Sequence, residues 1–321
     1  MKAVFIEQPG DTRALRYADF PKPEPAPGQV LVKIAAAGVN FIDTYHRSGL
    51  YKLPLPAVLG MEGAGTVEAL GQGVAGFKVG DPVAWAMARG SYAEYAAVPA
   101  QFLVKVPSGL DLRQAAAAML QGMTAHYLTH STFPIEPNHI ALVHAAAGGT
   151  GRLISQMVKL RGGRVIGTAG TREKAEVARL AGADDVILYR EQDLVAEVKR
   201  LTDGKGVDVV YDGVGEATFL QSLDCLKPRG MMAAFGQSSG PIKPVDPLLL
   251  STKGSLFLTR PTLANYSSPE EVKWRSSDVL GWILNKKLDL LIERVYPLAD
   301  AAQAHNDLES RKTMGKLVLT V

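Results

Sequence analysis

Six small residues in the middle of the chain, Ala146-Ala147-Gly148-Gly149-Thr150-Gly151, follow an apolar run of strand length and precede an amphipathic stretch of helix length. Glycines let a ligand approach the backbone closely, and the first turn of a helix offers unpaired N–H groups and a positive dipole end. The segment is therefore predicted to bind the pyrophosphate of a dinucleotide through Ala147, Gly148, Gly149, Thr150 and Gly151. Ala146 stands where the usual pattern has its first glycine, so an ordinary glycine-rich turn is the competing interpretation of the loop alone.

The segment after the next predicted strand indicates which dinucleotide is bound. An enzyme that uses NAD usually has an acidic residue there, about 20 residues after the loop, which accepts hydrogen bonds from the ribose hydroxyls. No acid ends the strand at Thr168, and Arg172 and Lys174 follow, which suits a ribose phosphate. We therefore expect NADPH rather than NADH, with Glu173 directed to solvent. A solvated helix face is the competing interpretation of the two cations.

Two different strand patterns surround these residues. From about residue 139, apolar strands alternate with helices, which predicts an α/β fold with a doubly wound parallel sheet. Before about residue 118, short strands separated by glycine turns indicate a compact barrel or sandwich. The tail, residues 316–321, has the pattern of a strand that returns to the first domain. The predicted strands are 1–6, 30–34, 63–69, 81–85, 91–95, 140–144, 165–167, 186–189, 207–211, 231–235 and 256–259.

The composition narrows the class of protein. A chain of 321 residues is expected to form about two domains. Its 35 basic and 32 acidic residues leave a net charge of +3, which argues against binding to nucleic acid or to an anionic membrane surface. No apolar run is long enough to span a bilayer. Cys225 is the single cysteine, so neither an intramolecular disulfide nor a cysteine-rich zinc site can form, and we expect a reducing, cytoplasmic compartment.

Several segments together resemble the zeta-crystallin type of quinone oxidoreductase, within the medium-chain dehydrogenase/reductase superfamily. They are residues 36–43 (AAGVNFID), 59–65 (LGMEGAG), 145–151 (AAAGGTG), 211–215 (YDGVG) and 236–240 (GQSSG). The resemblance covers the whole chain. It implies a GroES-like β-rich catalytic domain formed by residues 1–118 and 262–321, with an NADPH-binding Rossmann domain, 119–261, inserted between them. It also implies an active site in the cleft and a homodimer joined near residues 256–259.

Departures from the wider superfamily indicate the chemistry. Its zinc alcohol dehydrogenases have a metal-binding Cys at the place of Asn40 and a metal-binding His at the place of Met61. Neither Asn nor Met suits zinc, so no metal site is expected. Without a Lewis acid, the hydride acceptor must itself spread the incoming charge, as a quinone or an enone does.

The resemblance also implies the site residues. Asn40, Asp43, Tyr45 and Tyr51 are expected beside the nicotinamide as the catalytic group. Asn40 would hydrogen-bond the cofactor ribose or the substrate, and a tyrosine would stack on the acceptor or donate a proton, although wall-lining tyrosines are the competing interpretation. His144 is expected in the core, and Glu62 in a structural ion pair. The further cofactor contacts implied are Asn40, Thr124, Gly170, Thr171, Lys174, Tyr189, Val214, Phe235, Gly236, Ser238 and the backbone of Phe257.

Two other functions compete with quinone reduction. The same scaffold serves reductases of enones, alkenals and enoyl thioesters, which differ only in the acceptor. Relatives of zeta-crystallin also serve as NADPH-binding structural or RNA-binding proteins, and the near-neutral charge balance argues against RNA binding here.

Overall fold

The computed structural model describes all residues, 1–321. Its contacts divide the chain into two units, one formed by Met1–Met123 with Tyr266–Val321 and the other by Thr124–Asn265. The boundaries expected from the sequence, at 118 and 262, lie a few residues before these.

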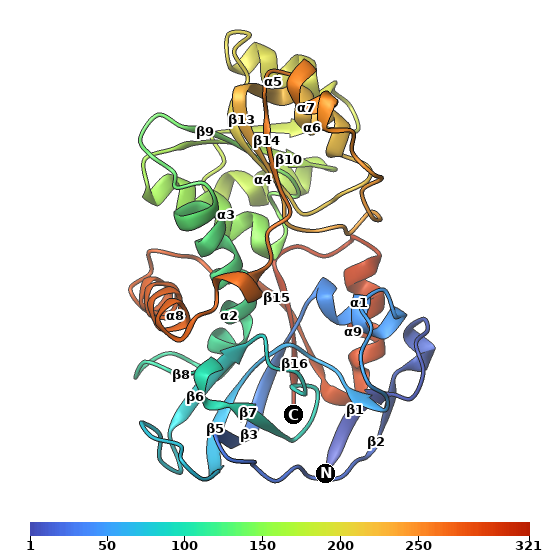
Figure 1. Cartoon of the computed structure of the whole chain (residues 1–321), viewed down its shortest axis with the longest axis vertical. Helices are drawn as coiled ribbons and strands as arrows, with labels where there is room; N and C mark the ends of the chain where they lie inside the picture. The colour runs from blue at the N-terminus through green and yellow to red at the C-terminus, as the bar shows by residue number, and fades with distance from the viewer. The chain divides into compact units, whose positions relative to one another are not determined.

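The second unit, green to orange in Figure 1, is built on a six-stranded sheet in the order β11-β10-β9-β12-β13-β14. Every neighbouring pair is parallel, and the chain order reverses between β9 and β12. This is the doubly wound arrangement predicted from the alternating pattern. The strands are β9 (Ile140–Val143), β10 (Arg164–Ala169), β11 (Asp185–Leu188), β12 (Val207–Asp212), β13 (Leu226–Ala234) and β14 (Phe257–Thr259).

The connecting helices of this unit begin where the sequence offers caps. The Thr171 hydroxyl accepts the N–H of Lys174 at the start of α4, and Asp193 accepts the N–H of Ala196 at the start of α5. Apolar side chains of the strands, such as those of Leu142, Ile166 and Val210, are fully buried in the core. The helices are α3 (Gly149–Leu160), α4 (Arg172–Leu180), α5 (Leu194–Leu201), α6 (Phe219–Cys225) and α7 (Pro247–Thr252).

The first unit contains a seven-stranded sheet in the order β15-β16-β3-β5-β6-β8, with β7 also paired to β3, and a three-stranded sheet in the order β2-β1-β4. The last strand, β16 (Lys316–Thr320), pairs antiparallel with β3 (Gln29–Val39), which confirms that the tail returns to the first domain. The other strands are β1 (Lys2–Ile6), β2 (Arg16–Asp19), β4 (Ala57–Val58), β5 (Glu62–Leu70), β6 (Pro82–Ala86), β7 (Tyr95–Pro99), β8 (Leu103–Lys105) and β15 (Ile292–Pro297).

One predicted strand of this unit was misplaced. The structure begins β7 at Tyr95, so most of the expected strand 91–95 precedes it. Tyr92 instead turns its whole side chain into the core, where it is 0% exposed. The helices of the unit are α1 (Phe41–Ser48), α2 (Leu112–Tyr127, which runs past the unit's end), α8 (Pro269–Leu284) and α9 (Ala301–Glu309).

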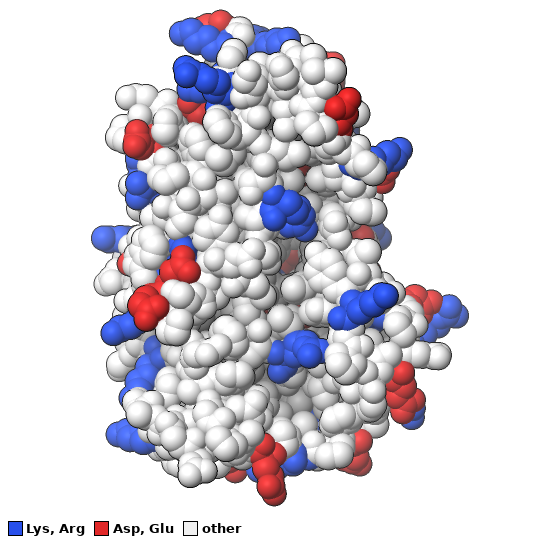
Figure 2. Space-filling view, viewed as in Figure 1, with Lys and Arg blue, Asp and Glu red and all other residues white.

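The face of the molecule drawn in Figure 2 has no dominant charge. Figure 2 shows basic and acidic side chains interspersed on the face drawn, with broad areas that carry neither. None of the helices combines the length and apolar character that crossing a membrane requires.

Candidate cofactor and substrate sites

The glycine-rich loop lies between β9 and α3, as the sequence predicts. Gly148 occupies the N-cap position of α3, and no side chain caps this helix, in contrast to α4 and α5. The N–H groups of the first turn are therefore left for a ligand rather than for a Ser, Thr or Asp oxygen. Ala145, just before the loop, has a φ of 50°, a left-handed conformation that glycine usually adopts.

Gly151 is the position in this loop that tolerates no side chain. A Cβ atom there would lie 2.4 Å from the carbonyl oxygen of Ala145, which is a backbone atom and cannot move aside freely. Gly148 is less restricted, because its Cβ would lie 3.2 Å from the same oxygen. Gly151 thus allows the close approach of strand and helix that a dinucleotide loop needs.

Buried polar groups hold the base of the loop. His144 is 4% exposed, and its two ring nitrogens contact the hydroxyls of Thr168, 3.1 Å away, and Ser222, 2.9 Å away. Burial lowers the pKa of His144, so the ring is neutral and one nitrogen can donate while the other accepts. The histidine predicted to lie in the core therefore also joins the ends of β9 and β10 to α6.

The residues expected to hold the adenosine half lie at the ends of β10 and β11. A Cβ on Gly170 would lie 2.7 Å from the Tyr189 hydroxyl, so these two predicted residues are adjacent, and Tyr189 is half exposed. No acid ends β10. Glu191 was not predicted to lie here. Its carboxylate lies 3.5 Å from the Arg172 guanidinium and forms an ion pair with one of the two cations expected to favour a ribose phosphate.

The cofactor contacts expected at the carboxyl edge of the sheet include residues on the loops after β12 and β13. One carboxylate oxygen of Asp212 accepts the N–H groups of Val214, at 2.7 Å, and Gly215, at 3.1 Å. A Cβ on Gly236 would lie 2.5 Å from the Gly213 oxygen, and the backbone N–H of Ser238 donates to that same oxygen. Because neighbouring parallel strands end at one edge of a sheet, these loops and the glycine-rich loop share that edge.

Two predicted cofactor contacts differ in exposure. Thr124, on α2, is 9% exposed. Phe257, on the edge strand β14, has a side chain that is 58% exposed, and only its backbone was expected to contact the cofactor.

Asn40 lies immediately before α1, and protein groups contact both its amide nitrogen and its amide oxygen. Its amide nitrogen donates to Glu62 Oε2 at 2.8 Å and to the Gly38 oxygen at 3.3 Å. Its amide oxygen accepts from Lys316 Nζ at 2.7 Å. Lys316 and Glu62 form a fully buried ion pair at 2.5 Å, which confirms the structural role expected for Glu62. The sequence analysis missed Lys316, although a lysine that begins an otherwise apolar strand was a signal.

The side chain of Asp43, which was expected beside the nicotinamide as part of the catalytic group, is enclosed by the protein. Its side chain is 0% exposed, and it accepts the Asn40 backbone N–H at 2.9 Å and the Tyr92 hydroxyl at 3.1 Å. An enclosed carboxylate cannot touch a substrate, so Asp43 fixes the start of α1 instead. Its other oxygen has no hydrogen-bond partner, and burial raises its pKa to about 7.

A directed chain of hydrogen bonds runs from Asp43 to the rim of the unit. Arg47 donates to Nδ1 of His305, so the neutral ring carries its proton on Nε2 and donates to the Tyr92 hydroxyl. Burial and the Arg47 charge lower the pKa of His305 to about 3, which keeps the ring neutral. Arg47 is anchored in turn by Glu309 of α9, at 2.8 Å.

Tyr45 and Tyr51 are brought together, as expected for residues that share a site. Their rings are 5.3 Å apart and meet edge to face, because Gly49 ends α1 with a φ of 80° and turns the chain back. Both side chains are half-buried, and the Tyr51 hydroxyl has no hydrogen-bond partner within the protein. The pair therefore offers an aromatic surface and a free phenol.

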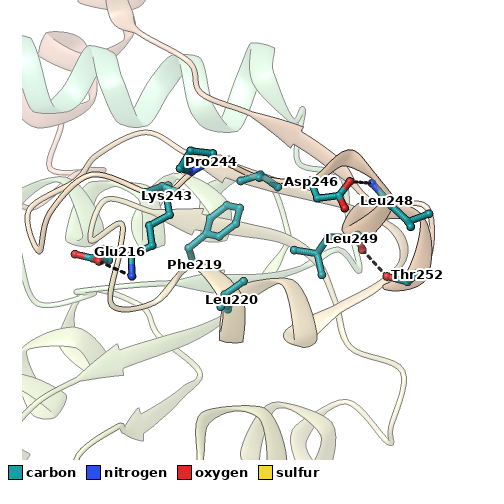
Figure 3. Close-up of a pocket in the computed structure, with 11 residues that line it drawn as sticks. Glu216, Phe219, Leu220, Lys243, Pro244, Asp246, Leu248, Leu249 and Thr252 are labelled. Carbon is teal, nitrogen blue, oxygen red and sulfur yellow. Dashed lines mark hydrogen bonds and ion pairs between the residues drawn. The ribbon is translucent and has the colours of Figure 1, made fainter.

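A cavity of about 560 Å³ lies in the second unit, beside α6 and α7 (Figure 3). Its walls are mainly apolar, with the exposed side chains of Leu220 and Leu248 among them. None of the predicted site residues lines it, so this cavity has no part in the site described here.

Gly151→Ala tests the geometry of the glycine-rich loop. We expect a loss of about 1–3 kcal/mol in the free energy of unfolding, because the new methyl group collides with backbone. Gly148→Ala is the matched control, and its loss should be clearly smaller. Denaturant unfolding of both variants provides the measurement, and equal losses would contradict the account.

Asp43→Asn tests the buried carboxyl. Folded Asp43 keeps its proton up to about pH 7, whereas the unfolded carboxyl loses it near its ordinary pKa of 3.8, so this group destabilises the fold as the pH rises between those values. The variant lacks this dependence. Relative to the unmodified protein, it should gain about 2–3 kcal/mol in the free energy of unfolding between about pH 5 and about pH 8.

Denaturant unfolding at the two pH values measures this gain, and Asp19→Asn, at an exposed carboxylate, is the control. A stability difference that is the same at both pH values would show that Asp43 does not titrate in this range.

Comparison with known proteins agrees with this geometry. Residues 26–108 match the alcohol dehydrogenase GroES-like domain, and residues 149–271 match the zinc-binding dehydrogenase family. A quinone oxidoreductase of Pseudomonas aeruginosa is 45% identical over 321 residues, which covers 99% of each chain. A 2-haloacrylate reductase of a Burkholderia species is 42% identical and covers 99% of this chain and 98% of its own.

A solved structure gives the same result in three dimensions. The quinone oxidoreductase of Escherichia coli, crystallised with NADPH, matches with a TM-score of 0.98 at 42% identity and covers 100% of both chains. These similarities span the entire sequence. The chain belongs to the quinone oxidoreductase family of the medium-chain dehydrogenase/reductase superfamily.

Proposed function

We propose that this protein reduces quinones with NADPH by hydride transfer and without zinc. The observation that carries the proposal is a full-length family resemblance, including a relative solved with NADPH, combined with Asn40 and Met61 at the two positions where zinc enzymes of the superfamily have ligands. An amide and a buried thioether are poor zinc ligands. No cluster of three or more His, Cys, Asp or Glu side chains is arranged to hold a metal.

The residues of the second unit fit the cofactor. The uncapped start of α3 and the glycine loop from Ala147 to Gly151 suit the pyrophosphate. Gly170, Thr171, Lys174 and Tyr189 would hold the ribose phosphate and adenosine, with Thr171 also capping α4. The contacts proposed for the nicotinamide half are Asn40, Thr124, Val214, Phe235, Gly236, Ser238 and the backbone of Phe257.

When bound, NADPH supplies the hydride, and the protein supplies orientation and a proton. Tyr45 and Tyr51 would stack on the flat acceptor, which limits it to reactive orientations. We propose that the free Tyr51 hydroxyl donates its proton to the carbonyl oxygen that gains negative charge, and that solvent then returns a proton to the phenolate. One hydride and one proton together convert the quinone to the hydroquinone.

The Burkholderia relative favours a second candidate, the reduction of a conjugated carbon–carbon double bond, because its similarity is nearly as high. The cofactor and the aromatic surface would serve both reactions. The two functions differ only in whether the acceptor takes the hydride into a quinone ring or at an alkene carbon.

We also infer a cytoplasmic homodimer. The sole cysteine, Cys225, is buried and unpaired, which suits a reducing compartment. The edge strand β14 with its exposed Phe257 is the proposed contact, since an unpaired strand edge favours pairing with a second copy.

Steady-state oxidation of NADPH with a panel of acceptors tests the function. We expect quinones to give the highest kcat/KM, an enone or 2-haloacrylate to give less, and NADH to be at least about tenfold poorer than NADPH, equivalent to the loss of one charged contact. A higher kcat/KM with the alkene acids would favour the second candidate. NADPH binding without turnover of any acceptor would leave only a binding protein.

Tyr51→Phe tests the proton donor. Loss of the hydroxyl should lower kcat about a hundredfold, while the KM for NADPH stays unchanged. Tyr17→Phe, at a half-exposed tyrosine of β2, is the matched control. If kcat matches that of the unmodified protein, Tyr51 only lines the site.

A further inference from the structure

The Lys316–Glu62 ion pair contacts both the oxygen and the nitrogen of the Asn40 side-chain amide. Lys316 Nζ contacts both Glu62 Oε2, at 2.5 Å, and Asn40 Oδ1, at 2.7 Å. The second oxygen of Glu62 accepts the backbone N–H of Leu120, on α2, at 2.6 Å. Both charged side chains are 0% exposed, so water does not complete their hydrogen bonding.

The sequence around the pair makes room for it. A Cβ on Gly38 would lie 2.1 Å from Glu62 Oε2 and 2.8 Å from Lys316 Cε. The two charged side chains therefore fill the space that a side chain at position 38 would occupy. Burying an ion pair costs desolvation energy. A glycine that leaves room for such a pair therefore indicates that the pair has a specific role.

The partners leave the Asn40 amide only one orientation. An ammonium group only donates hydrogen bonds, so it must face the amide oxygen, and a carboxylate only accepts, so it must face the amide nitrogen. A flipped amide would set like groups against each other on both sides. Both N–H bonds of the amide are engaged, with Glu62 and with the Gly38 oxygen.

We propose that Lys316 is a positioning residue that fixes Asn40 as a hydrogen-bond acceptor toward the bound cofactor. The hydrogen-bonding position of the amide that remains unused is the second lone pair of Oδ1. Asn40 therefore accepts from a donor, such as a ribose hydroxyl or the carboxamide N–H of the nicotinamide, and has no N–H to stabilise an oxyanion on the substrate. This inference rests on the proposed function, and it assigns the stabilisation of the reduced acceptor to the tyrosines.

A double-mutant cycle between Lys316 and Asn40 tests whether the lysine acts through the amide. Lys316→Met should lower kcat/KM for NADPH and quinone about tenfold, but less than about twofold in an Asn40→Ala background, since the amide is then already absent. Lys316→Arg should recover most of the loss. An equal cost of Lys316→Met in both backgrounds would overturn the proposal.

Hydrogen exchange of the Asn40 side-chain amide, followed by NMR on ¹⁵N-labelled protein, gives a readout that needs no turnover. Exchange should be slow in the unmodified protein and at least about tenfold faster in Lys316→Met, with the exposed Asn138 as internal reference. Arg275→Met, at another buried cation of the same unit, is the matched control and should leave Asn40 exchange unchanged. Unchanged Asn40 exchange in Lys316→Met would overturn the proposal.

If Lys316→Met does not fold, it is combined with Glu62→Gln, which removes both charges together and leaves no unpaired charge. Faster exchange of the Asn40 amide in that double variant supports the proposal. Unchanged exchange overturns it. If the unmodified protein reduces no quinone, the proposed function fails, and the exchange result alone decides the role of Lys316.

Discussion

The buried ion pair between Lys316 and Glu62 is the constraint on which the first unit depends. It joins two residues 254 positions apart and lies 0% exposed, and a buried charge is tolerated only when its partner is in place. The pair therefore fixes the register of β16 on β3, in which Leu317 faces Val39. A slip of one residue would turn Lys316 to the opposite face of the sheet and leave Glu62 unpaired.

The second unit is organised by hydrogen bonds of buried polar side chains to one another and to the backbone. His144 joins two strand ends to α6, and Asp212 holds the N–H groups of the next loop, so the loops that would surround a dinucleotide are fixed before it binds. Such preorganisation reduces the entropy lost on binding. The chemistry then depends on orientation and on a conjugated acceptor, because the first unit offers an amide and a thioether where metal enzymes have ligands.

The sequence predicted most of the fold, because strand and helix patterns and glycine loops are local properties. The loop at Gly148–Gly151 and the return of the tail to the first domain were predicted in this way. The burial of Asp43 could not be predicted, since family resemblance indicates which residues are neighbours but not which way a side chain turns. Tyr92 shows the same limit: its aromatic, alternating surroundings indicated a strand, whereas tertiary packing placed it in the core ahead of β7.

The role of Lys316 was the least predictable feature, because its partner Asn40 lies 276 residues away in the sequence. Only the fold brings them together. Lysine is ordinarily a surface residue, so its position in an apolar strand signals burial but does not identify the partners that stabilise the buried charge.

Hydride transfer from NADPH to a quinone without a metal is tested most directly by measuring turnover after metals have been removed from the protein. The protein is dialysed against a strong chelator, its metal content is measured by plasma mass spectrometry, and NADPH oxidation by a quinone is then followed. We expect full turnover with far less than one metal ion per chain. Activity that is lost on chelation and restored by stoichiometric zinc would contradict it.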